Sequence, residues 1–160
     1  LIANQVSSVP SFDLMRFLPV GSFGATPFAL VVPTNSGIKN FDDLIRSMQV
    51  DQARINYGSP GIYSVHHLGV ESLLKKTKTS AQHIPYQGGA QIVTDLLAGR
   101  LTFALLSIHL ASQYAQTDQL RVIAVTGPKR TAGMAATPTI SELTFTFQMG
   151  QFGLSINPMR

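Results

Sequence analysis

Two glycine-rich segments and one serine carry most of the chemistry that this sequence offers. Gly58-Ser59-Pro60-Gly61 and Gln87-Gly88-Gly89 each follow a short strand-like segment and precede a stretch with helical periodicity, and Ser107 occupies the same kind of position farther along. The first turn of a helix presents unpaired N–H groups and a partial positive charge, so it binds anions. Glycine also lets a ligand approach the backbone closely. These segments therefore predict an anion-binding site.

The predicted site uses backbone N–H groups near Ser59 to Ser64 and near Gly88 to Ala90, with Ser107 beside them. The candidate ligand-binding residues are Gly58, Ser59, Pro60, Gly61, Tyr63, Ser64, Tyr86, Gly88, Gly89, Ala90 and Ser107. The hydroxyl groups of Ser59, Ser64, Thr94 and Ser107 are possible additional donors, and the Tyr63 ring could line the pocket. The alternative is structural: each glycine only forms a tight turn, and Tyr63 covers a helix end or packs on another lobe.

Two common phosphate-binding motifs are absent from the sequence. Neither glycine-rich segment reads G-x-x-x-x-G-K-[ST] or G-x-G-x-x-G. Those two patterns are typical of nucleoside triphosphate and dinucleotide sites. The anion is therefore expected to be a smaller molecule, and no cofactor is predicted.

The sequence offers little support for catalysis. Ser59 lacks the first glycine of the G-x-S-x-G nucleophile elbow. His66 and His67 are adjacent, so on a helix they point about 100° apart, and neither has a second histidine four residues on. His83 and His109 are isolated in the sequence. We predict a protein without enzymatic activity and without a metal; a small hydrolase that uses Ser59 with His66 or His67 is the alternative.

The composition indicates a folded domain of moderate size. The chain has 160 residues, of which 44% are hydrophobic and 12% are charged. This supplies enough apolar material for a core and too little charge for a disordered chain. The absence of cysteine excludes disulfides, cysteine-ligated zinc and thiol catalysis.

The net charge of +4 does not indicate nucleic-acid binding, because the basic residues are scattered. The one cluster, Lys75, Lys76 and Lys78, falls at a predicted helix C-terminus, where cations complement the helix dipole. A mild positive field also suits a receptor for anions. No apolar run approaches the roughly 18–20 residues of a membrane span, so no direct membrane insertion is predicted.

Alternating strands and helices position these residues. The predicted strands are 28–32, 54–57, 83–86, 101–106, 122–125 and 152–156. The predicted helices are 40–48, 64–75, 90–98, 108–116 and 139–143. The strands are apolar without a clean period-two alternation, which is typical of parallel strands covered on both faces. The fold class is therefore α/β, a mostly parallel sheet flanked by helices, and ligands bind at the carboxyl ends of such strands.

The order of several segments resembles the Bug-type receptors of tripartite tricarboxylate transporters. The segments are Phe12-Asp13, Phe17-Leu18-Pro19-Val20, Phe28-Ala29-Leu30-Val31-Val32, Phe41-Asp42-Asp43-Leu44-Ile45, Ile55-Asn56-Tyr57-Gly58-Ser59-Pro60-Gly61, Ile84-Pro85-Tyr86-Gln87-Gly88-Gly89-Ala90, Thr94-Asp95-Leu96-Leu97-Ala98-Gly99-Arg100-Leu101 and Leu120-Arg121-Val122-Ile123-Ala124-Val125-Thr126. Ile62 and Tyr63 depart from the family's usual small polar residues.

The resemblance implies a two-lobed periplasmic binding protein that closes on a small carboxylate and passes it to membrane transporter subunits. Residues 28–125 would form the second, ligand-gripping lobe. Residues 1–27 would belong to the first lobe and the connection, and residues 126–160 would return to the first lobe. Much of that first lobe is missing, so the chain resembles a fragment of a longer exported receptor. The alternative of a different class is the effector-binding domain of a transcriptional regulator, which is also two-lobed and α/β.

Overall fold

A computed structural model of the chain describes residue 18 and residues 26–143. The strands are β1 (Phe28–Pro33), β2 (Asn56–Ser59), β3 (Gln82–Pro85), β4 (Phe103–Ser107) and β5 (Leu120–Val125). The α-helices are α2 (Phe41–Val50), α3 (Val65–Thr77), α4 (Gly89–Leu97) and α5 (Ile108–Gln116). Short 3-10 turns are η2 (Thr34–Ser36), η3 (Gln52–Arg54) and η4 (Ala132–Met134). The predicted strand at 152–156 lies outside the described residues.

Capping residues fix where the helices begin and end. Asn40 accepts a hydrogen bond from the Asp43 N–H at 2.9 Å and so caps α2, as the sequence predicts. Ser64 caps α3 by accepting from the His67 N–H at 3.2 Å. Gly99 follows α4 with a φ of +71°, a left-handed conformation that glycine adopts at low cost. The α4 helix therefore ends where its sequence predicts.

The five strands form one mixed sheet in the order β3-β2-β4-β1-β5. β2 is parallel to both β3 and β4, whereas β1 is antiparallel to both β4 and β5. Four strands thus run in one direction, and β1, between β4 and the edge strand β5, runs against them. The prediction of an α/β fold with a mostly parallel sheet is confirmed, and β1 is the one antiparallel strand among the described residues.

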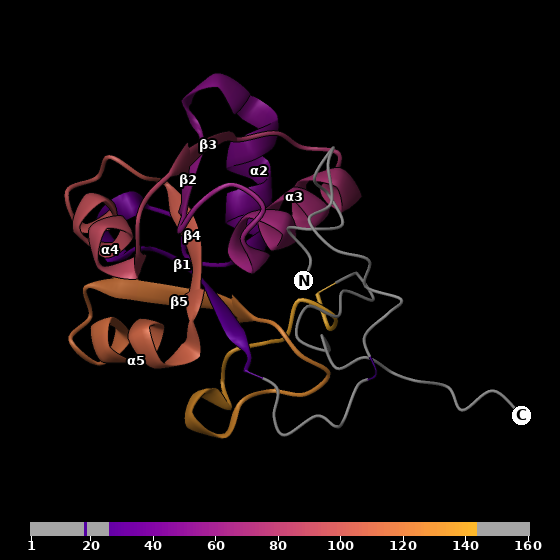
Figure 1. The fold of residues 1–160 in the computed structure, drawn as a ribbon, viewed down its shortest axis with the longest axis vertical. Helices are drawn as coiled ribbons and strands as arrows, with labels where there is room; N and C mark the ends of the chain where they lie inside the picture. Colours follow the sequence, from indigo (N-terminus) through magenta and orange to yellow (C-terminus); the bar gives the residue numbers. More distant parts are fainter. Residues whose placement is uncertain (1–17, 19–25, 144–160) are drawn as a thin grey trace, which may run out of the picture.

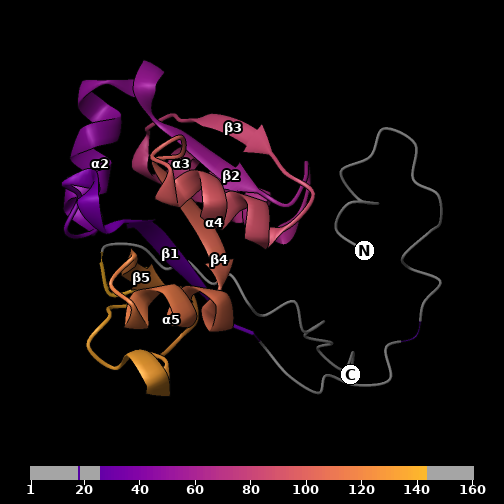
Figure 2. The same ribbon diagram turned by 90° about the vertical axis from the view of Figure 1, so that its left-hand side faces the viewer.

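Helices cover both faces of the sheet (Figure 1). On one face, Leu30 and Phe103 pack with the apolar sides of α2 and α3. On the other face, Ala104 and Leu106 pack with α4 and α5. Successive strand residues point to opposite faces, so consecutive apolar residues of β1 and β4 fill two separate cores. Figure 2 shows the sheet from the side that α4 and α5 cover.

The chain enters and leaves this sheet at neighbouring points. The Phe28 N–H donates to the Thr126 hydroxyl at 2.8 Å, and the Thr126 N–H donates to the Phe28 carbonyl at 2.8 Å. Residues 139–143 form a turn and not the predicted helix, with i to i+3 bonds such as Glu142 N–H to the Thr139 carbonyl at 3.1 Å. Five residues are too few for a stable helix without further packing.

Candidate functional site

The two glycine-rich loops lie at the same edge of the sheet. β2 and β3 are parallel, with Ser59 opposite Pro85, and the Tyr86 N–H donates to the Ser59 carbonyl at 2.8 Å. Ser107 ends β4, the neighbour of β2 on its other side. The carboxyl ends of these three parallel strands therefore meet at one edge, which the predicted site requires.

The beginning of α4 is the helix start most open to an anion. Gly88 occupies the N-cap position, and no side chain caps the helix there. Ala90 lies in the first turn and is exposed. The start of α5, after Ser107, also lacks a side-chain cap, but the Ile108 N–H donates to the Pro27 carbonyl at 3.3 Å. The first turn of α4 thus keeps unpaired N–H groups for a ligand.

The loop between β2 and α3 is fixed by its own hydroxyl groups. The Ser59 hydroxyl donates to the Gly61 carbonyl at 2.9 Å and is fully buried. The Ser64 hydroxyl caps α3. Gly61 has a φ of +121° and Tyr63 a φ of +63°. The predicted donor role of the Ser59 hydroxyl is wrong, because that hydroxyl stabilises the turn; the loop can still present backbone N–H groups.

The four glycines of the predicted site serve two different purposes. A Cβ at Gly58 would lie 2.7 Å from the Leu101 side chain, and a Cβ at Gly89 would lie 2.9 Å from the Leu110 side chain. These two glycines allow close packing of α4 and its neighbours. A Cβ at Gly61 or Gly88 would meet no atom within 4 Å. Only Gly61 and Gly88 therefore border open space that a ligand could enter.

Two hydroxyl groups near the site are engaged elsewhere. The Tyr86 hydroxyl donates to Asp95 of α4 at 2.7 Å, and Arg100 holds the other oxygen of that carboxylate at 2.9 Å. Burial, followed by the bond to Asp95, raises the pKa of Tyr86 to about 12. The bonds from Tyr86 and Arg100 lower the pKa of Asp95. The Thr94 hydroxyl donates to the Ala90 carbonyl at 3.1 Å, so neither Tyr86 nor Thr94 offers a free hydroxyl.

Two apolar side chains are exposed at the loop between β2 and α3. Ile62 is 62% exposed and Tyr63 is 45% exposed. The Tyr63 ring lies 6.2 Å from the His67 ring, and its backbone N–H donates to His67 Nδ1 at 3.1 Å. Large apolar side chains at an open edge indicate a surface that another group covers.

A histidine pair behind this loop is not visible in the sequence. His83 of β3 pairs with Tyr57 of β2, and its ring stacks on His67 of α3 at 4.1 Å. His83 Nε2 lies 2.7 Å from the Ser59 hydroxyl oxygen. Burial, and then the neighbouring His67, lower the pKa of His83. No single segment of the sequence indicates this pair, because it forms only when α3 packs across β2 and β3.

The predicted hydrolase pairings do not form. The histidine that contacts Ser59 is His83, whereas His66 packs edge-on against Phe28 at 4.7 Å. Burial lowers the pKa of His66. Both His66 and His67 are partly buried. Within residues 26–143 no group of three histidine or acidic side chains is arranged to hold a metal, and no helix among them is long and apolar enough to cross a membrane.

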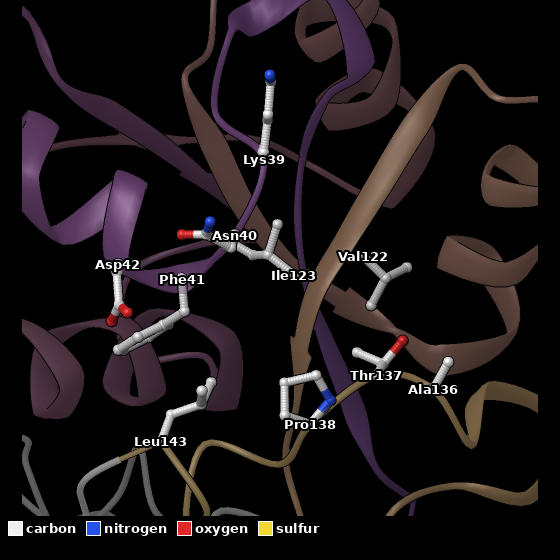
Figure 3. Close-up of a pocket in the computed structure, with 10 residues that line it drawn as sticks. All are labelled: Lys39, Asn40, Phe41, Asp42, Val122, Ile123, Ala136, Thr137, Pro138 and Leu143. Atoms are coloured by element: carbon white, nitrogen blue, oxygen red, sulfur yellow. The ribbon is translucent and has the colours of Figure 1, made fainter.

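Two cavities in the described region lie away from the predicted loops. One, of about 270 Å³, opens between the start of α2 and β5, and it is lined by residues such as Lys39, Asp42 and Thr137 (Figure 3). Another, of about 410 Å³, includes Pro33 and Gln119, at the opposite end of the sheet. Neither of these two cavities contains a predicted site residue. The predicted site is therefore distinct from both.

Comparison with known proteins gives consistent matches over most of the chain. The family model described as "Tripartite tricarboxylate transporter family receptor" matches residues 8–158. A UPF0065 protein of Cupriavidus necator is 33% identical over 152 residues, which cover 94% of this chain and 45% of that protein. The protein BugT of Bordetella pertussis is 25% identical over 142 residues, covering 89% of this chain and 44% of BugT. The chain spans less than half the length of these relatives.

Solved structures share the fold. A TctC solute-binding protein from Polaromonas superposes with a TM-score of 0.78 at 24% identity, covering 88% of this chain and 48% of that one. Rpa4515 of R. palustris, solved with adipate, superposes with a TM-score of 0.78 at 24% identity, covering 89% of this chain and 48% of Rpa4515. MatC of Rhodopseudomonas palustris, solved with malate, gives 0.76 at 17% identity, covering 87% and 50%.

The family match decides between the classes that the sequence leaves open. Receptors of this family are binding proteins and not enzymes, so the hydrolase alternative is not retained. The effector domain of a transcriptional regulator is likewise replaced by the family assignment. Since the family model matches most of the sequence, the chain belongs to the tripartite tricarboxylate transporter receptor family.

Proposed function

We propose that this chain is the ligand-gripping lobe of a periplasmic receptor that captures a small carboxylate and delivers it to the membrane subunits of a tripartite tricarboxylate transporter. The carboxylate binds at the carboxyl edge of the sheet, between the β2–α3 loop and the start of α4. Residues 28–125 form this lobe, and the segments before and after it belong to the other lobe. The bond pair between Phe28 and Thr126 supports this division, because it brings the two crossing segments together.

The observation that carries the proposal is the shared edge of the two loops. Parallel pairing of β2 and β3 brings Gly61 and Gly88 to that edge, both beside open space. The uncapped first turn of α4 adds unpaired N–H groups and the positive end of the helix dipole. Backbone donors of this kind suit the two oxygens of a carboxylate and need no cofactor.

Dicarboxylates are the first ligands to test. Two proteins with the same fold were solved with adipate and with malate. A ligand that binds the native state raises the melting temperature, by an amount that grows with the logarithm of its concentration relative to its Kd. We expect the complete receptor to be stabilised by at least one member of a carboxylate panel and not by the matching neutral amide. Equal effects of acid and amide, or none from the whole panel, would contradict the proposed function.

A further inference from the structure

His67 contacts the loop through a backbone hydrogen bond. The Tyr63 N–H donates to His67 Nδ1 at 3.1 Å. Tyr63 stands in the left-handed region, with a φ of +63°, where a non-glycine residue persists only if its surroundings hold it there. His67 lies in the first turn of α3, a rigid element compared with the loop. Its imidazole is thus placed to fix the conformation of Tyr63.

Four titratable groups face the His67 ring in the described region. The His83 ring of β3 stacks on it at 4.1 Å, and the Tyr57 ring of β2 lies parallel at 6.3 Å. Glu71, one turn farther along α3, places a carboxylate oxygen 3.9 Å from His67 Nε2. The Tyr63 ring is tilted against it at 6.2 Å. The His67 side chain is only 13% exposed, so the imidazole lies between the sheet and the loop.

The hydrogen-bond pattern specifies which nitrogen carries the proton. His67 Nδ1 accepts from Tyr63, so that nitrogen is unprotonated and any ring proton lies on Nε2, on the Glu71 side. The Ser59 hydroxyl donates its one hydrogen to the Gly61 carbonyl. In its contact with His83 Nε2, the Ser59 oxygen therefore accepts and the His83 ring donates.

We propose that His67 is a positioning residue for carboxylate capture: its ring accepts the Tyr63 N–H and so holds Tyr63 and the β2–α3 loop in the ligand-binding conformation. The inference rests on the proposed function of the loop. Loss of the acceptor at position 67 therefore loosens the loop and weakens ligand binding, and a side chain that restores the acceptor restores both.

The first test measures the loop without a ligand. Protection of the Tyr63 amide against hydrogen exchange, relative to its intrinsic rate, is compared in the complete receptor and in two variants. His67→Asn places a carbonyl oxygen close to the position of Nδ1 and does not titrate, whereas His67→Ala removes the acceptor. We expect about tenfold lower protection in His67→Ala, the size of one lost hydrogen bond, and near wild-type protection in His67→Asn. Unchanged protection in His67→Ala would overturn the proposal.

The second test measures capture, with adipate as the probe and calorimetry at about pH 8, where its carboxyl groups are ionised. We expect His67→Ala to bind adipate about tenfold more weakly than the wild type, and His67→Asn, which keeps an acceptor, to bind with nearly wild-type affinity. Equal affinities of the wild type and His67→Ala, or an equal loss in both variants, would overturn the coupling to capture. If the wild type fails to bind adipate or any other carboxylate at pH 8, the proposed function fails, and the Tyr63 amide alone decides the role of His67.

Discussion

Tyr63 stands in a backbone conformation that few tyrosines adopt. Its φ of +63° costs roughly 1–2 kcal/mol relative to the right-handed region. The ring is 45% exposed at the edge where the ligand is proposed to bind. Strain at an exposed loop is typical of binding sites, where the surrounding structure holds it. Tyr63 is therefore the side chain of the loop most suited to determine which ligands fit.

Replacement of Tyr63 tests whether its ring contacts the ligand. In the complete receptor, Tyr63→Ala is expected to weaken binding of an aromatic acid by roughly tenfold, because stacking contributes about 0.5–1.5 kcal/mol beyond area burial. Binding of a small aliphatic diacid is expected to change little. Tyr63→Phe, which keeps the ring, is the control. Calorimetry that gives equal losses for both acids, or no loss for either, would assign Tyr63 a structural role.

Gly58 and Gly88 differ in what a side chain would meet. A Cβ at Gly58 would lie 2.7 Å from Leu101 and 3.0 Å from Ile92, whereas one at Gly88 would meet nothing within 4 Å. We predict that Gly58→Ala lowers the free energy of unfolding by about 1–3 kcal/mol through overpacking. Gly88→Ala is the matched control; its extended backbone, with a φ of 179°, accepts alanine. Urea denaturation that gives equal stabilities for the two variants would contradict this packing role.

Residue types at the site could be predicted from the sequence, but their partners could not. Glycine next to a predicted helix start indicates an anion site whether or not the strand order is known. The contact between Ser59 and His83 spans 24 positions and depends on the pairing of β2 with β3. Likewise, the sequence cannot show that the Leu101 side chain occupies the space beside Gly58 while the space beside Gly88 is open.

At the scale of elements, local signals predicted most helices and a mostly parallel sheet, but they did not give the direction of β1. Asn40 and Gly99 mark helix ends because their own backbone and side-chain chemistry suits those positions. β1 reads as a buried strand in either direction, since both of its faces are covered by helices. Its antiparallel placement between β4 and β5 follows from the path of the whole chain, which no short segment contains.

The link between β3 and α4 is testable through the Tyr86–Asp95 bond. The lowered pKa of Asp95 means that its ionisation contributes stability above its unfolded pKa, near the usual 3.8, and that this contribution is lost as the pH falls through the folded value. Tyr86→Phe keeps the ring and removes the bond, so the pKa of Asp95 should rise toward 3.8. An NMR titration that follows the Asp95 carboxyl carbon measures this pKa.

The same substitution has a consequence for stability. The wild type should exceed Tyr86→Phe in stability at neutral pH, and the difference should shrink below about pH 4, where the carboxylate becomes protonated in both proteins. Arg100→Gln, which removes the other partner of Asp95, provides a comparison. If the two proteins differ in the free energy of unfolding by the same amount across the acid range, the Tyr86 bond to the ionised Asp95 carboxylate is not the cause of that difference.

At the scale of the whole molecule, the described region supplies only part of a binding pocket. The chain spans less than half the length of its relatives, and the proposed site is an open edge. A receptor that closes around its ligand buries it between two lobes. We therefore expect the 160-residue chain by itself to bind adipate about 10²–10⁴-fold more weakly than the complete receptor, through a loss of about 3–5 kcal/mol. Calorimetry that gives equal affinities would contradict a two-lobed site.

The most direct measurement of the central claim is a map of backbone amide shifts as adipate is added to the complete receptor. If the carboxylate is held by the β2–α3 loop and the start of α4, the largest shifts within residues 26–143 will fall at Gly61 to Ser64 and at Gly88 to Ala90, and the neutral diamide of adipate will cause none of them. Shifts concentrated instead around Lys39 and Thr137, in the cavity beside β5, or equal shifts with the diamide, would contradict it.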